Sequence, residues 1–558
     1  MLRVCHAAWL KSRSFFSGSL DFWRAVTGIA LKCGQAGASP LYYPLHKGPF
    51  MSEITKKIRD RVDQLLTTWM TEDGTYYVDI ESPDGSITSM KPSNKPGTDF
   101  VGWLTHLCAS EFDHDIKTDL INTTFSRICH RVKTEGNIRK TAVRNGGSDK
   151  EVIVDLCDSL GRFVKITPGT IETVLQNPSD IKFIKSKGSG VLPKPNVDSN
   201  TLLTTWLKKY IDTNDNDICL LASWIVGCMK PKGPYPILIL TGEQGSGKST
   251  TARMLRRLVD PHVFDLREPF EDRRDLVAAV KNSFILAFDN VSILKFWLSD
   301  QLCRISTGTG TLGGRTLYTD TEETAIMACR PIILNGIPDF AERGDLLDRA
   351  IQIQLPTIRP SKRRDDDEYW RLFEADYAEI TGAIYRATQA ALSNFSSVKL
   401  DEKPRMSAFA TWIVAAEPTL GWRKGLFLEA YKSNREIAEA NLLEFNSLAS
   451  SVMRMMDKNP MFSGTYAELI GNLIKYLGPK EVLPPTSHAI SAELKRISPL
   501  LKRQRIHVYN GGRKTSGGSE GKGRSMVQIQ KYELGQEIPD NFETLLAQIQ
   551  EESSKQLG

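Results

Sequence analysis

The sequence predicts a multidomain α/β protein organised around a phosphate-binding loop. Three observations carry this prediction: the chain has 558 residues, an apolar run at 235–240 is typical of a buried strand, and residues 251–258 have helical spacing directly after a glycine-rich stretch. A chain of this length exceeds what one hydrophobic core usually holds, so we expect three or more domains. We expect an α/β core, an N-terminal α+β region, a helical subdomain and a C-terminal winged-helix-like domain.

The glycine-rich stretch is the most specific motif in the chain. Residues 242–249 fit the phosphate-binding pattern G-x-x-x-x-G-K-[ST]. Glycines let the backbone turn so that successive N–H groups point at phosphate oxygens. Lys248 would reach the β- and γ-phosphates of ATP, and the Ser249 hydroxyl would bind Mg²⁺. A chance match is the competing interpretation, and the flanking strand and helix disfavour it. The predicted nucleotide-binding residues are Gly242, Glu243, Gln244, Gly245, Ser246, Gly247, Lys248, Ser249 and Thr250.

Two later apolar strands end in side chains suited to the same chemistry. The run 283–289 ends in Asp289, and a carboxylate at a strand end can hold Mg²⁺ through water. The run 331–334 ends at Asn335, whose amide can orient an attacking water toward the γ-phosphate. Asn335 also starts an Asn-Gly dipeptide, so a simple turn is the alternative. Both residues join Lys248 as candidate catalytic residues.

Arg349 is the fourth candidate catalytic residue. It stands between Asp345-Leu-Leu-Asp348 and an apolar run, where a helix end meets a strand. A guanidinium there could reach a neighbouring subunit's nucleotide as an arginine finger. An ion pair within the chain, to Asp345 or Asp348, is the alternative.

Composition limits the class of protein. Apolar residues make up 41% and charged residues 25% of the chain, as in ordinary globular proteins. Apolar runs fall short of the roughly 20 residues that a membrane span needs. The nine cysteines form no C-x-x-C pair and cluster with no histidines at metal-ligand spacing. We therefore expect a reduced, cytoplasmic protein without a structural zinc or a membrane span.

The N-terminal third divides into a leader and an α+β region. Residues 1–50 carry six Lys or Arg against Asp21, which resembles a targeting peptide, but we favour Met51 as the natural start. We expect residues 1–50 to be poorly ordered. In the region 51–195, we expect a strand at 76–80, helix over 103–129, and a hairpin formed by 151–156 and 161–166.

The remaining boundaries follow from composition and periodicity. Residues 185–200 are rich in Gly, Pro, Ser and Lys and are typical of a linker. Thr465 and Glu468 form a capping box that opens a helix, and a second helix is expected over 488–502. The predicted parts are 1–50, 51–195, 201–360 (ATPase core), 361–455 (helical), 460–535 (winged-helix-like) and a polar tail at 536–558.

Basic residues concentrate near the C-terminus. Ten Lys or Arg lie between 495 and 531 against one acid, Glu520, an excess of +9 that exceeds the +6 of the whole chain. Such an excess beside two helices and a glycine-rich hairpin favours binding to the phosphate backbone of DNA, and a solvated basic loop is the alternative. The predicted contacts here are Lys502, Arg503, Arg505, Arg513, Lys514, Lys522 and Arg524.

The order of these motifs resembles a known group. Thr-Gly-Glu-Gln-Gly-Ser-Gly-Lys-Ser-Thr at 241–250, Phe-Asp-Asn at 288–290, Arg-Thr-Leu-Tyr-Thr-Asp at 315–320 and Arg-Pro-Ile-Ile-Leu-Asn-Gly at 330–336 are similar to AAA+ ATPases. Within them, the likeness is greatest to superfamily 3 helicases of phages, plasmids and small DNA viruses and to phage-type primase-helicases. It covers residues 201–360. The chain also resembles bacterial and prophage proteins labelled only as ATP-binding.

This resemblance implies a ring-forming DNA helicase or translocase, with a separate primase as a further partner. It implies the loop, metal, sensor and finger roles for Lys248, Ser249, Asp289, Asn335 and Arg349. The stretch 308–315 stands where superfamily 3 proteins carry a hairpin that grips single-stranded DNA. Arg304 and Arg315 are therefore added as candidate DNA contacts, and a plain surface hairpin is the alternative.

One position departs from the AAA+ pattern. Most AAA+ enzymes have an acidic general base after the strand-end aspartate, whereas this chain has Asn290. An amide can position water but cannot take its proton. Either another acid such as Glu268 or Glu271 serves, or hydrolysis is slow. The departure favours a second hypothesis, a non-translocating AAA+ switch, loader or phage-defence sensor. A third is a nucleic-acid binder that uses ATP only to assemble.

Overall fold

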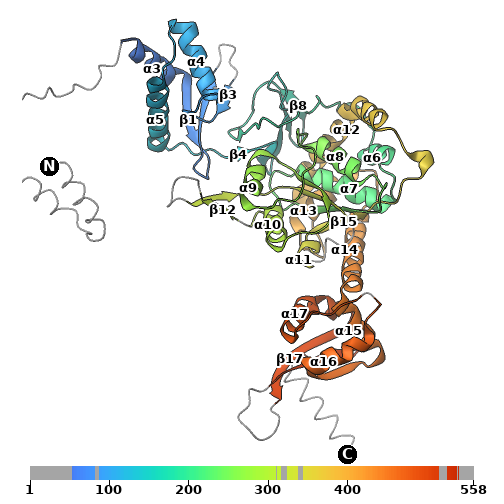
Figure 1. The fold of residues 1–558 in the computed structure, drawn as a ribbon. Helices are drawn as coiled ribbons and strands as arrows, with labels where there is room; N and C mark the ends of the chain where they lie inside the picture. Colours follow the sequence, from blue (N-terminus) through green and yellow to red (C-terminus); the bar gives the residue numbers. More distant parts are fainter. Residues whose placement is uncertain are drawn as a thin grey trace, which may run out of the picture. The chain divides into compact units, whose positions relative to one another are not determined.

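The computed structural model describes residues 53–81, 87–309, 311–315, 323–336, 344–479, 481–514 and 524–533, with 535, 536, 538 and 539 (Figure 1). The expected leader 1–50 and nearly all of the expected tail lie outside these residues. The chain divides into two compact units, 1–61 and 62–558, and helix α3 (Glu53–Leu65) crosses that boundary. Within the described part, no helix has the length and apolarity required to span a membrane.

The first sheet of the larger unit is antiparallel, in the order β1-β2-β3, from Leu66–Met70, Tyr76–Glu81 and Ile87–Met90. Two helices follow, α4 (Asp99–Phe112) and α5 (Thr118–Glu135). The predicted single helical stretch over 103–129 is therefore wrong in one respect. Asp113 adopts a left-handed φ of 45° and ends α4, so residues 113–117 separate two helices.

A second antiparallel sheet has the order β5-β6-β7-β8, from Asn145–Ser148, Glu151–Asp155, Phe163–Ile166 and Ile171–Val174. Its β6–β7 pairing confirms the predicted hairpin. The short strands β4 (Thr141–Ala142) and β9 (Lys182–Phe183) pair in parallel beside it.

The segment 185–200, expected to be a linker, contains no helix or strand but is packed against the fold. The backbone N–H of Asn196 donates to the carbonyl of Ala378 in α12 (Asp366–Asn394). A Cβ on Gly382 of the same helix would lie 1.8 Å from the Asn196 oxygen, so only glycine permits this approach. Composition predicted the irregular backbone but not its contact with the helix.

The central sheet consists of four parallel strands in the order β11-β14-β10-β15. Their bounds are Ile237–Thr241 (β10), Leu286–Val291 (β11), Ile332–Gly336 (β14) and Ala350–Gln354 (β15). Every residue of β14 is buried, as expected for a parallel strand covered on both faces. Alternate β10 residues face two apolar clusters: Leu238 and Leu240 join one, Ile237 and Ile239 the other.

Helices cover both faces of this sheet. The first cluster contains residues of α7 (Asp215–Cys228) and α8 (Lys248–Val259), and the second contains residues of α9 (Arg273–Asn282) and α10 (Phe296–Thr307). The other elements of this region are α6 (Leu203–Tyr210), α11 (Gly344–Leu347) and an antiparallel pair, β12 (Thr311–Arg315) and β13 (Glu323–Met327).

The region predicted to be helical is helical. It contains α12, α13 (Ser407–Ala416) and α14 (Leu426–Phe445), with short 3-10 turns at 360–362, 395–397 and 417–419. Phe373, Phe409 and Phe427 belong to the same apolar cluster as Leu238 and Leu240 of β10. The helical region and the parallel sheet are therefore stabilised by one shared core.

The C-terminal part has its own apolar core. Its elements are α15 (Ser447–Lys458), β16 (Met461–Thr465), α16 (Tyr466–Leu473), α17 (Ser487–Arg503), β17 (Ile506–Lys514) and β18 (Arg524–Lys531), with a 3-10 turn at 474–476. The strands form an antiparallel sheet in the order β16-β18-β17. The predicted capping box of Thr465 and Glu468 is confirmed, whereas β16 was not predicted. Most of α15 lies within the region 361–455 that was predicted to be helical, but its apolar residues pack in the C-terminal core.

The first residue after β15, Leu355, contacts the start of the glycine-rich loop. The Leu355 amide donates to the Thr241 carbonyl, and a Cβ on Gly242 would lie 2.5 Å from the Leu355 oxygen. Gly242 also has a φ of 149°, which L side chains rarely adopt. The first glycine of the loop is thus required both by its conformation and by the neighbouring backbone.

We expect Gly242→Ala to lower the thermal unfolding midpoint, because the new Cβ must displace backbone rather than a flexible side chain. Gly102→Ala in α4 is the matched control, since a Cβ there meets nothing within 4 Å. Alanine within a helix is more favourable than glycine by about 0.5–1 kcal/mol, so the control should leave stability unchanged or raise it. Equal midpoints for the two variants would contradict the close packing at Gly242.

Candidate nucleotide-binding site

The glycine-rich loop joins the end of β10 to the start of α8. Gly245 and Gly247 both have left-handed backbone, with φ of 81° and 77°. Lys248 opens the helix and folds back over the loop, where its Nζ donates to the carbonyls of Gly242 at 2.7 Å and Glu243 at 2.8 Å. The free N–H groups and the dipole of α8 therefore meet the loop at one point, an arrangement that favours a bound anion.

Ser249 and Asp289 meet across the parallel sheet. The Ser249 hydroxyl donates to Asp289 Oδ1 at 2.9 Å, although the residues lie forty positions apart in the sequence. A hydroxyl and a carboxylate at this separation are the hard oxygen donors that Mg²⁺ prefers, so this donor pair fits the predicted metal. The pairing is possible because β10 and β11 run in parallel and end at the same edge of the sheet.

Asn335, at the end of the intervening strand β14, is almost completely buried, with 1% of its surface exposed. Its Oδ1 accepts a hydrogen bond from the Asn290 amide at 3.0 Å. Its Nδ2 has no hydrogen-bond partner among the described residues. An unpaired buried amide donor costs free energy, so a ligand oxygen at this position would be stabilised by it.

A cavity of about 1010 Å³ joins these groups. Its lining includes every predicted nucleotide-binding residue together with Asp289 and Asn335. Sequence reasoning did not assign three further lining residues, Asn290, Gly336 and Gln354. Gln354 could have been found, because it ends a fourth parallel strand at the same edge of the sheet.

The C-terminal end of α8 is hydrogen-bonded to the residues that directly precede β11. Asp260 accepts hydrogen bonds from the backbone amides of Phe284 at 2.8 Å and Ile285 at 2.9 Å. The buried Arg144 donates to the same carboxylate at 3.1 Å. Nearby, burial and the positive charge of Arg256 lower the pKa of His262 to about 4. His262 is therefore neutral at pH 7 and adds no charge to this anchor.

Arg349 lies away from the cavity. It precedes β15, whose first residue is in register with Ile237, whereas the loop follows Thr241 at the opposite end of β10. Six residues at about 3.3 Å each put roughly 20 Å between Arg349 and Gly242 along the strands. Arg349 Nη1 donates to the backbone oxygen of Asp345 at 2.6 Å. The Asp348 carboxylate, its other expected partner, instead pairs with Arg405 and Arg435.

The alternative acids considered for proton transfer lie outside the cavity lining. Glu268 and Glu271 are both exposed, and Glu271 pairs with Lys295. Two carboxylates belong to the described lining, those of Asp289 and Glu243. Glu243 Oε2 accepts a hydrogen bond from Thr357 at 3.2 Å.

The predicted DNA contacts lie on α10, on the strand pairs β12–β13 and β17–β18, and at the end of α17. Arg304 is exposed on α10, and Arg315 ends β12 opposite Glu323. Lys502 and Arg503 stand in the last turn of α17, where Arg503 pairs with Glu439 of α14.

The remaining basic candidates belong to the β17–β18 hairpin or precede it. Arg513 and Lys514 end β17 opposite Ser525 and Arg524, and Lys522 lies outside the described residues. Arg505 has a structural role, since its guanidinium donates to the backbone oxygens of Tyr532 and Glu533. Arg505 is thus a weaker candidate for a phosphate contact than the strand-end residues.

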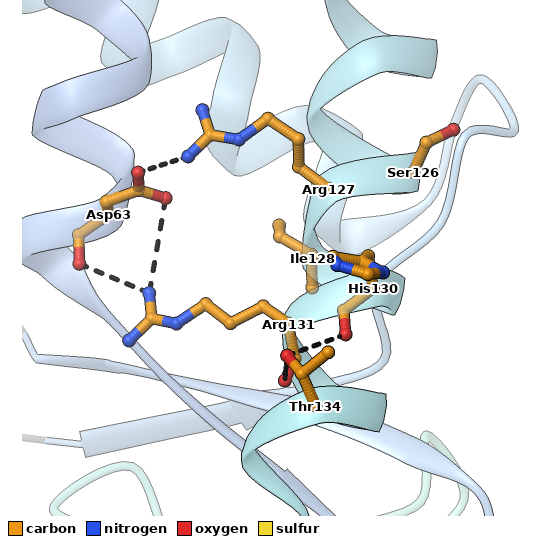
Figure 2. A pocket seen from close by; sticks show the side chains of 7 residues that line it. All are labelled: Asp63, Ser126, Arg127, Ile128, His130, Arg131 and Thr134. Carbon is orange, nitrogen blue, oxygen red and sulfur yellow. Dashed lines mark hydrogen bonds and ion pairs between the residues drawn. The ribbon is translucent and has the colours of Figure 1, made fainter.

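A separate cavity of about 640 Å³ lies along α5 (Figure 2). Figure 2 shows Arg127 and Arg131 pointing from α5 toward the Asp63 carboxylate, and both form ion pairs with it. The Arg131 guanidinium also donates to the Asp63 backbone oxygen at 3.4 Å. Because the carboxylate offsets part of the positive charge, this cavity has no chemistry comparable to that around Lys248.

Comparison with solved structures reveals remote similarities. The apo A form of the NrS-1 C-terminal region shares 11% identity, covers 86% of this chain and 98% of its own, and has a TM-score of 0.36. A JCV helicase bound to a thiazolopyridine-containing acetamide shares 11% identity, covers 45% of this chain and 69% of its own, and has a TM-score of 0.20. TM-scores this low support no argument about function.

Family models are more informative. Residues 205–434 match the model described as the actinomycete integrative conjugative element replication protein, and residues 448–537 match the C-terminal domain of the same proteins. No curated protein shows a significant match. The first region contains the whole cavity, and the second contains the three-stranded sheet with its helices. Over these two regions, which together make up more than half of its length, the chain is similar to the replication proteins of actinomycete integrative conjugative elements.

Proposed function

We propose that this protein is an ATP-dependent DNA helicase or translocase that acts in the replication of a mobile element. The observation that carries the proposal is the convergence of Lys248, Ser249, Asp289 and Asn335 on one cavity at the carboxyl edge of a parallel sheet. The match to replication proteins supplies the biological setting. The core would then be an AAA+ P-loop ATPase similar to those of superfamily 3.

Each group in the cavity has a distinct part in this proposal. Lys248 exchanges its bonds to the loop carbonyls for the β- and γ-phosphate oxygens of ATP. Ser249 and Asp289 hold Mg²⁺, which supplies charge neutralisation between the phosphates when bound. Asn335 Nδ2 donates to the γ-phosphate or to the attacking water. Phosphoryl transfer depends mainly on such positioning and charge stabilisation.

Arg349 has a role in this proposal only across a subunit interface. The roughly 20 Å between it and its own loop, estimated from strand geometry, excludes direct contact within one chain. Its Nε is buried and has no hydrogen-bond partner among the described residues. The residue as a whole is partly exposed, as a contact with a neighbouring subunit's nucleotide requires. We therefore propose a homo-oligomeric ring in which Arg349 completes the adjacent site.

The C-terminal region is proposed to bind DNA as a winged helix. Its elements follow the order helix, strand, helix, helix, strand, strand, with the basic hairpin between β17 and β18 as the wing. Arg513 and Lys514 enter the tip of this hairpin and Arg524 leaves it. The β12–β13 pair, with Arg304 nearby in sequence, is proposed as a second DNA contact within the ring.

One observation favours a second candidate function, a non-translocating AAA+ switch, loader or phage-defence sensor. Asn290 occupies the usual position of the general base, and neither Glu268 nor Glu271 lines the cavity. Slow hydrolysis would suit a protein that responds to ATP rather than moving along DNA. Strand unwinding by the purified protein distinguishes the two candidates, since a switch would show none.

We expect Lys248→Ala to abolish ATP hydrolysis while leaving the fold intact. The lysine stabilises charge on the transferred phosphoryl group, so its loss should reduce the rate by orders of magnitude. Phosphate release from ATP is the measurement, and exposed Lys208→Ala is the matched control. Unchanged turnover in folded Lys248→Ala protein would falsify the assignment of this loop.

Mixing two inactive variants tests Arg349. Neither Lys248→Ala nor Arg349→Ala should hydrolyse ATP alone, but mixed rings contain some interfaces with both residues intact. Arginine fingers contribute about 10³- to 10⁵-fold in rate, so the recovered activity should be easily measured. If the variants assemble, as light scattering would show, and activity stays absent on mixing, Arg349 has a structural role within its own chain instead.

The basic hairpin should supply most of the resting affinity for DNA. Changing Arg513, Lys514, Lys522 and Arg524 to Gln should flatten the dependence of log affinity on log salt, by up to about 0.9 per lost contact on duplex DNA. The loss should be similar for unrelated sequences, because phosphate contacts do not read bases. Fluorescence anisotropy at several salt concentrations gives the slope.

The matched control replaces four exposed lysines of the helical region with Gln, namely Lys399, Lys403, Lys424 and Lys432. This variant should keep the wild-type slope, and both variants should keep DNA-independent ATP turnover. An unchanged slope in the hairpin variant would leave residues 505–530 as an ordinary solvated loop.

A further inference from the structure

The pairing of β11 with β14 contains an irregularity at the cavity. Phe288 is in register with Leu334, and Val291 is in register with Gly336. Asp289 and Asn290 together therefore face the single residue Asn335, which is the arrangement of a β-bulge. Bulges are uncommon between parallel strands and often redirect side chains next to active sites.

Asn290 is the residue that makes the bulge possible. Its φ is 51°, in the left-handed region, whereas most residues other than glycine avoid positive φ. Asparagine tolerates this conformation better than other side chains, and glutamate does not share that tolerance. The Asn290 side chain is exposed, so its amide is not needed by a buried neighbour. The backbone conformation explains why asparagine stands here.

The bulge directs one backbone N–H at two functional side chains. The backbone N–H of Asn290 donates to Asn335 Oδ1 at 3.0 Å and to Asp289 Oδ1 at 3.0 Å. The first bond fixes the orientation of the Asn335 amide, because the opposite flip would set its NH₂ group against another donor. Nδ2 is thereby left as the unpaired end of a side chain that is 1% exposed and lines the cavity.

We propose that Asn290 is a positioning residue: its left-handed backbone holds the Asn335 amide with Nδ2 available to the γ-phosphate of bound ATP. This inference rests on the proposed function and deepens it. Through the same N–H, the residue connects Asn335 to the carboxylate of Asp289. Binding of ADP, which lacks the γ-phosphate, does not use the donor that Asn290 holds in place.

The proposal and the missing-base interpretation make opposite predictions for Asn290→Glu, and two further variants test the backbone role. If position 290 only lacks a general base, Asn290→Glu should raise ATP turnover. If it positions Asn335 through its backbone, Asn290→Gly should behave like wild type, since glycine adopts positive φ freely. Asn290→Ala and Asn290→Glu should both be impaired, because the left-handed conformation is unfavourable for their side chains.

The experiment measures the ratio of affinities for a non-hydrolysable ATP analogue and for ADP. We expect Asn290→Ala and Asn290→Glu to lower this ratio about tenfold, the factor that corresponds to the left-handed backbone cost, with little change in ADP affinity. Asn290→Gly should keep the ratio within about twofold of wild type. ATP turnover should likewise fall in Asn290→Ala and Asn290→Glu and stay near wild type in Asn290→Gly.

An unchanged ratio in folded Asn290→Ala protein, or increased turnover in Asn290→Glu, overturns the inference. Should Asn290→Ala not fold, Asn290→Gly and Asn290→Glu still give the comparison. Failure of the proposed function looks different, because wild-type protein itself would then bind neither nucleotide. Normal ATP binding by wild type with indifferent Asn290 variants rejects only the positioning role.

Discussion

The geometry of the cavity depends on two hydrogen-bonded contacts that hold α8 against β11. At one end, Ser249 donates to Asp289, and at the other, Asp260 accepts from the amides of Phe284 and Ile285. Asp260 directly follows the last helical residue, and Phe284 and Ile285 directly precede β11, so the two contacts lie at opposite ends of both elements. Together they fix the glycine-rich loop relative to the strand end that carries Asp289.

The parallel sheet converts sequence separation into proximity. Strands β10, β14 and β11 lie side by side and end at one edge, which brings the loop, Asn335 and Asp289 together. The bulge then links the last two through a single N–H of Asn290.

The apolar cores show which parts are stabilised together. The parallel sheet, the β5–β8 sheet and the helical region share one cluster, so these segments support one another's packing. The C-terminal sheet and its helices have a cluster of their own. The regions proposed to hydrolyse ATP and to bind DNA thus have separate apolar cores. The ion pair between Arg503 of α17 and Glu439 of α14 is one of the contacts between the C-terminal part and the helical region.

The sequence by itself determined the loop, the strand ends at Asp289 and Asn335, the hairpin of β6 and β7, and the capping box at Thr465, because these depend on local pattern and spacing. The tertiary structure decided the break at Asp113, the packing of Asn196 on α12, the placement of Arg349 at the opposite edge from the loop, and the structural use of Arg505. Each of these depends on a neighbour distant in sequence or on a backbone conformation without a local signature. Asn290 illustrates the limit most clearly: its sequence context suggested a missing base, whereas its positive φ shows a residue suited to a bulge.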